Sequence, residues 1–134
     1  MAEETMRVVW IVGCAWLASL ALTAAKETKP VEVARLPSYT EGPVVDYDGN
    51  LFVSEPFGKN ISRITPDGDV SVWASTGAPN GHKILADGTH LVCDGEHHAV
   101  LHLTSSGEML EPAATDCDGR TLGFPNDLAL DSTR

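Results

Sequence analysis

A repeat of 39 residues in the middle of the chain constrains the fold more than any other feature. The segment DGNLFVSEPFGKNISRITPDGDVSVWAS, at 48–75, aligns with DGTHLVCDGEHHAVLHLTSSGEMLEPAAT, at 87–115. The Asp-Gly pair that opens each segment coincides, and so do the apolar runs that follow it. A period of about 40 residues is typical of proteins in which similar units stack on one another.

Each repeat predicts four short antiparallel strands. From Val31 onward, short apolar runs alternate with Asp-Gly, Asn-Gly and Ser-Gly pairs, without a helical period. Such pairs supply the positive φ angles that tight hairpin turns need. The expected strands are 42–46, 51–55, 60–64 and 69–74 in the first repeat, and 81–85, 90–94, 99–103 and 108–113 in the second. A further run at 125–131 predicts the first strand of a third repeat.

The expected fold is all-β, a partial β-propeller of about two four-stranded blades and the start of a third. Four strands in each unit of about 40–45 residues are typical of propeller blades. Blades bury both faces against their neighbours, and a propeller closes with about four to eight of them. We therefore expect 37–134 to be the N-terminal part of a longer protein. The alternative is a small stand-alone β-sandwich.

An uncharged apolar run precedes the repeats. Residues 8–25 follow Arg7, carry no charge and end in small side chains. This pattern predicts a signal peptide over 1–25, with Met6 as a possible true start and 26–36 as a linker or first edge segment. The expected location is periplasmic or secreted. The alternative is an uncleaved membrane anchor, for which the run is short because a spanning helix needs about 20 residues.

The composition argues against several partners and sites. The chain has 9 Lys and Arg against 19 Asp and Glu, a formal net charge of -10. Because such a surface repels polyanions, we expect no nucleic-acid partner and no membrane contact after signal cleavage. Cys93 and Cys117 could pair in an oxidising compartment, but their spacing does not establish it. The lack of a C-x-x-C pair disfavours a thiolate zinc site.

Three strand openings carry the residues best suited to chemistry. Glu41, Asn80 and Asn126 each stand beside glycine or proline, just before an apolar run. The innermost strand of a propeller blade lines the central channel, so these side chains could converge on one axis. Carboxylate and amide oxygens are hard ligands that suit Ca²⁺ or Mg²⁺. The alternative is that both asparagines only form turns.

The ordered motifs at these openings resemble a known family. Glu-Gly-Pro at 41–43, Pro-Asn-Gly at 79–81 and Pro-Asn-Asp-Leu at 125–128 are similar to the N-terminal part of the gluconolactonase family, which includes regucalcin and the luciferin-regenerating enzyme. The resemblance runs from about Pro37 to Arg134. It implies a six-bladed propeller that holds one divalent metal and hydrolyses a sugar lactone or a similar small ester.

The resemblance also implies roles for single residues. Glu41 matches the first metal ligand of the family, and Asn126 matches an asparagine that faces both metal and substrate. Asp127 and Asn80 are expected to bind substrate beside it. Phe124 stands where some members carry an arginine that holds the substrate. The expected metal is Ca²⁺, with Zn²⁺ or Mg²⁺ as alternatives.

The family's other metal ligands and its catalytic base come from later blades. We therefore expect this chain to be inactive by itself. A non-catalytic ligand-binding or protein-binding propeller is the alternative function, because propellers host many activities.

Several other side chains invite a functional interpretation that the sequence does not support. The run Glu96-His97-His98 is expected to be a solvated loop, because adjacent side chains in a hairpin point to opposite faces. His82 and His102 are expected on strand faces, and Trp73 in the core of the first repeat.

Overall fold

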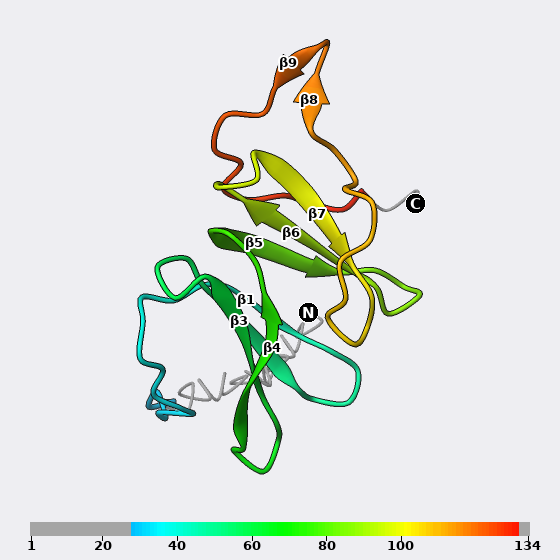
Figure 1. Cartoon of the computed structure of the whole chain (residues 1–134). Helices are drawn as coiled ribbons and strands as arrows, with labels where there is room; N and C mark the ends of the chain where they lie inside the picture. The colour runs from blue at the N-terminus through cyan, green and yellow to red at the C-terminus, as the bar shows by residue number, and fades with distance from the viewer. Residues whose placement is uncertain (1–27, 132–134) are drawn as a thin grey trace, which may run out of the picture. The chain divides into compact units, whose positions relative to one another are not determined.

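The computed structural model of the protein describes residues 28–131 (Figure 1). The chain divides into two compact units, Met1–Pro30 and Val31–Arg134, and every assigned strand lies in the second. Within the described residues all regular secondary structure is β, which confirms the expected all-β class. The predicted signal peptide, 1–25, lies outside them. No helix in the described part is long and apolar enough to cross a membrane.

The first repeat forms a sheet of four antiparallel strands in the order β1-β2-β3-β4. The strands are β1 (Glu41–Val45), β2 (Leu51–Glu55), β3 (Asn60–Ile64) and β4 (Val70–Ser75). Each lies within one residue of its predicted bounds. The turns between them contain Gly49 with φ 83° and Gly68 with φ 90°, as expected for Asp-Gly turns.

The second repeat forms a sheet of three strands in the order β5-β6-β7. These are β5 (Pro79–Ile84), β6 (His90–Asp94) and β7 (Ala99–Leu103). A short hairpin of β8 (Asp116–Cys117) and β9 (Arg120–Thr121) follows. Its turn, Asp118-Gly119, has φ 52° and 74°, the two positive angles of a tight hairpin turn.

The predicted strand at 108–113 is wrong as a regular strand. The segment lies along β7, but it is joined by isolated bridges such as Leu103 with Met109. Pro112 has no N–H to donate, and the N–H groups of Ala113 and Ala114 both reach the carbonyl of Val100. The ladder is therefore interrupted. The predicted first strand of a third repeat is also wrong, since 125–131 contains no assigned strand.

The repeat seen in the sequence is also a repeat of backbone structure. β6 pairs with β7 in the register in which β2 pairs with β3, displaced by 39 residues. Ser54 thus faces Ile61, and Cys93 faces Val100. Positive φ angles recur at equivalent positions, at Lys59 and His98, Gly49 and Gly88, and Gly68 and Gly107.

One hydrophobic core joins the two sheets. Its buried members are Phe52, Ile61, Ala74, Val92, Ala99, Leu101 and Leu103. β5 contacts both β1 and β2, so the second repeat packs on the first. Burial of each large apolar side chain contributes about 1.5–3 kcal/mol, which makes this core the main source of stability.

Trp73 was expected in the core of the first repeat, and the structure corrects this. Its ring stacks on His82 of β5, with centroids 6.0 Å apart, and meets Phe52 of β2 edge-on at 5.0 Å. Its Nε1 donates a hydrogen bond to the carbonyl of Ser105 at 3.2 Å. Trp73 therefore packs between the repeats. Strand positions had been expected for His82 and His102, and both are confirmed on β5 and β7.

The two cysteines of the repeats are free thiols. Cys93 is buried in β6, whereas Cys117 is exposed in the β8–β9 hairpin. The pairing that the sequence left open is therefore not formed. Burial is the main cause that raises the pKa of the Cys93 thiol, so this cysteine is inert at neutral pH.

Candidate functional site

The three predicted strand openings, at 41–43, 79–81 and 125–128, lie next to one another in chain order, although no strand follows the third. Gly42 has φ 49°, and a Cβ atom at this position would collide with the backbone carbonyl of Asn80. The backbone of Gly81 comes similarly close to the segment at 126–127. Its N–H donates to the carbonyl of Asn126 at 2.8 Å, and a Cβ would lie 2.6 Å from the Cα of Asp127. Glycine is needed where two backbones come this close.

This adjacency brings the predicted site residues to neighbouring places. Glu41 directly precedes Gly42, and Asn80 directly precedes Gly81. The pairing of β1 with β2 shifts just after Glu41, and that of β5 with β6 shifts just after Pro79. Such bulges change the direction of nearby side chains. Both strand openings are therefore irregular at the residues singled out from the sequence.

The side chains at the openings differ in their partners. Glu41 accepts a hydrogen bond from the Tyr39 hydroxyl at 2.6 Å, which raises the pKa of that phenol. Asn80 is 9% exposed, whereas Asn126 and Asp127 are exposed. Asp127 Oδ1 accepts from the N–H of Leu128 at 2.8 Å and lies 3.4 Å from the Lys83 ammonium.

These contacts fix the charge of Asp127. The N–H of Leu128 has the largest effect in lowering the pKa of its carboxyl, followed by the Lys83 charge. Asp127 is therefore ionised at neutral pH, beside the opening that holds Asn126. The third opening thus carries a negative charge next to Asn126, one of the predicted cation ligands.

The donor set fits a hard divalent cation better than a soft one. It consists of one carboxylate, from Glu41, and the amide oxygens of Asn80 and Asn126. Among residues 28–131, no group of three or more His, Cys, Asp or Glu side chains is placed to hold a metal. Amide and carboxylate oxygens suit Ca²⁺, which takes about six to eight oxygen ligands. These three residues would supply only part of that shell.

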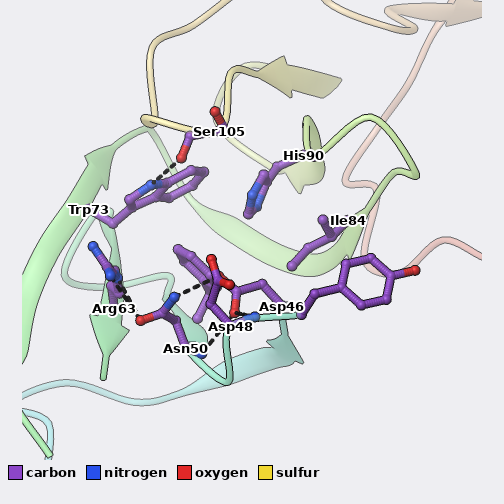
Figure 2. Close-up of a pocket in the computed structure, with 11 residues that line it drawn as sticks. Asp46, Asp48, Asn50, Arg63, Trp73, Ile84, His90 and Ser105 are labelled. Atoms are coloured by element: carbon purple, nitrogen blue, oxygen red, sulfur yellow. Dashed lines mark hydrogen bonds between the residues drawn. The ribbon is translucent and has the colours of Figure 1, made fainter. Parts of the chain in front are cut away.

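A cavity of about 280 Å³ lies at the other ends of these strands (Figure 2). One wall is a chain of polar contacts. Arg63 donates from Nε and Nη2 to Asn50 Oδ1 at 3.1 and 2.9 Å, and Asn50 Nδ2 donates to Asp46 Oδ2 at 2.7 Å. Burial alone would raise the pKa of Asp46, but hydrogen bonds from Asn50 and Asp48 and the Arg63 charge outweigh it and lower the pKa.

His90 lines the opposite side of this cavity, and its ring contacts a second buried histidine, His82. His82 Nε2 and His90 Nδ1 lie 2.8 Å apart, and both rings touch Phe52 and Trp73. Burial, followed by the charges of His90 and Lys83, lowers the pKa of His82 to about 3. Burial also lowers the pKa of His90. Both rings are therefore neutral at physiological pH. The sequence predicted the strands on which these histidines lie, but not their contact with each other.

The turn at 96–98 is exposed, as expected for a solvated loop, but its side chains are held by specific contacts. His97 Nδ1 lies 3.0 Å from Asp94 Oδ1, and the ring of His98 is hydrogen-bonded to the carbonyl of Gly123. Glu96 forms an ion pair of 2.6 Å with Lys59. The sequence did not indicate the contact between Asp94 and His97, because Asp94 alone carries no visible motif.

The comparison with known proteins leaves the family open. No protein-family model matches the chain, and no curated protein matches it significantly. The resemblance to the gluconolactonase family therefore rests on the three motifs at 41–43, 79–81 and 125–128.

Proposed function

We propose that 37–134 is the N-terminal part of an exported, gluconolactonase-like β-propeller that hydrolyses a sugar lactone or similar small ester with a divalent cation. The observation that carries this proposal is the adjacency of the openings, where Gly42 meets Asn80 and Gly81 meets Asn126. Repeated blades of a propeller would place successive openings side by side in this way. The 39-residue displacement between the two sheets supports the same arrangement.

In this proposal each residue at the openings has its own task. Glu41 and Asn126 hold the cation, and Asn126, Asp127 and Asn80 bind the substrate. A bound divalent cation supplies Lewis-acid polarisation of a carbonyl and stabilises the charge that develops on its oxygen. The Tyr39 hydroxyl orients the Glu41 carboxylate through its hydrogen bond.

Phe124 bears on the substrate class. Its side chain is 62% exposed. It offers no charge to a substrate carboxylate, which favours neutral lactones over sugar acids. In this proposal the catalytic base comes from outside these openings, so lactone hydrolysis is not expected from 37–134 alone.

Calcium binding to the full chain tests the proposed site. We expect Glu41→Gln to weaken Ca²⁺ binding by about tenfold or more, because it removes the one carboxylate ligand from the opening. Isothermal titration calorimetry measures the affinity. Glu108→Gln, which removes an exposed carboxylate in the turn after β7, is the matched control and should change little. Equal affinities for the parent and Glu41→Gln would contradict the site.

A sugar lactone separates the hydrolase from its alternative. If the lactone carbonyl joins the cation at the openings, saturating lactone should tighten Ca²⁺ binding, and Asn126→Ala should abolish that effect. A non-catalytic binding propeller is favoured by the separate cavity lined by Trp73, Arg63 and His90. If the lactone does not change the affinity for Ca²⁺, the result would support the non-catalytic binding propeller.

A further inference from the structure

The carboxylate of Asp94 is an anchor built into the end of β6. It is fully buried and accepts backbone N–H groups from four residues, at 2.9–3.1 Å: Gly77, Ala78, Glu96 and His97. Burial alone would raise the pKa of Asp94, but these donors and the His97 ring outweigh burial and lower it. Asp94 therefore stays ionised at neutral pH inside the protein.

This anchor determines which nitrogen of His97 carries the proton. His97 Nδ1 lies 3.0 Å from Asp94 Oδ1, and an ionised carboxylate can only accept a hydrogen bond. Nδ1 must therefore carry the hydrogen, which leaves the lone pair of the neutral ring on Nε2. The His97 side chain is 44% exposed, and no hydrogen bond joins Nε2 to the described residues. A free lone pair on an oriented ring is the geometry of a general base.

The surroundings of the pair also favour a site. Gly77 lies directly against it, because a Cβ there would be 2.7 Å from Asp94 Oδ1 and 2.9 Å from His97 Nδ1. Strand β5 begins at Pro79, two residues after Gly77. On another side, the Phe124 ring packs on Gly95 while remaining 62% exposed. An exposed aromatic ring thus lies against Gly95, two residues before His97, where it can contact an aryl group.

We propose that Asp94 and His97 form a second hydrolytic site, which cleaves small aryl esters without a metal. His97 Nε2 accepts a proton from water as the water oxygen bonds to the ester carbonyl carbon. The bond from that carbon to the aryl oxygen then breaks, and the proton on Nε2 passes to the leaving oxygen. The products are a carboxylic acid and a phenol. Asp94 positions the ring, and neither Glu41 nor a cation takes part.

Hydrolysis of p-nitrophenyl acetate by the full chain in EDTA tests this proposal. We expect His97→Gln to lower the protein-dependent rate by about tenfold or more, the scale of a lost general base. His98→Gln is the matched control, because His98 is exposed in the same turn and its ring is hydrogen-bonded to the carbonyl of Gly123 rather than to Asp94. Its rate should match the parent. Equal rates for the two variants would overturn the proposal.

A measurement that needs no turnover checks the geometry. Nitrogen-15 NMR of the histidine rings should show His97 protonated at Nδ1 and free at Nε2, and Asp94→Asn should lose this preference. A ring protonated at Nε2 would overturn the assignment. Because EDTA is present, failure of calcium binding at the openings would leave these results unaffected.

Discussion

Replacing Gly42 with alanine is expected to lower the free energy of unfolding by at least about 3 kcal/mol, since it combines backbone strain with overpacking. Gly42 has φ 49°, a conformation that L side chains rarely adopt. The new Cβ would also collide with the backbone carbonyl of Asn80, and a backbone cannot move aside as a flexible side chain can. Urea denaturation measures the loss.

Gly68→Ala separates the two contributions. Gly68 has φ 90°, but no atom lies within 4 Å of the position of its Cβ. The substitution should therefore cost only the strain of a positive φ, about 1 kcal/mol. If Gly42→Ala and Gly68→Ala cost the same, the close approach of β1 to the opening of β5 is not present in solution.

Acid is expected to destabilise the protein through the buried His82–His90 pair. An unfolded histidine has a pKa of about 6.5, whereas burial lowers the pKa of folded His82 to about 3. Between these values the unfolded chain binds more protons than the folded one, so stability rises with pH. The stability from neutral His82 is complete above pH 6.5 and is lost as the pH falls toward 3. The loss is on the order of 4 kcal/mol.

His82→Gln provides the test, because glutamine does not titrate. The variant starts from a lower stability, but its unfolding free energy should fall less steeply between pH 6.5 and 4.5 than that of the parent. His98→Gln, at an exposed site, should keep the steep fall of the parent. Denaturant titrations at each pH supply the values. A His82→Gln profile parallel to the parent's would show that His82 does not carry the acid sensitivity.

Local features of the fold could be predicted because short sequence signals determine them. The Asp-Gly turns at Gly49 and Gly68 follow from the positive φ that they require. The strands of the first sheet follow from the apolar runs between those turns. The repeat itself was visible because the turn residues recur at one spacing. At 108–113 the same spacing predicted a strand that does not form. Pro112 has no N–H to donate, and two N–H groups share the carbonyl of Val100, which interrupts the ladder.

Contacts between the repeats could not be predicted in the same way. His82 and His90 lie on different strands, and Trp73 meets them from the other sheet. The Asp94–His97 contact depends on how the chain turns after β6. The convergence of Glu41, Asn80 and Asn126 on one axis stays a prediction. The structure shows that the backbone of Gly42 lies against Asn80 and that of Gly81 against Asn126. The roles of the three side chains in binding remain a proposal.

The most direct test of the account is where a paramagnetic divalent cation binds. Substoichiometric Mn²⁺, a substitute for Ca²⁺ at oxygen ligands, would be added to the nitrogen-15-labelled full chain. The account predicts that the amide signals of Gly42, Gly81 and Asn126 broaden first, while those of Gly68 and Gly88 in the Asp-Gly turns remain sharp. Broadening that begins at Gly68 and Gly88 and spares the openings would contradict a shared cation site.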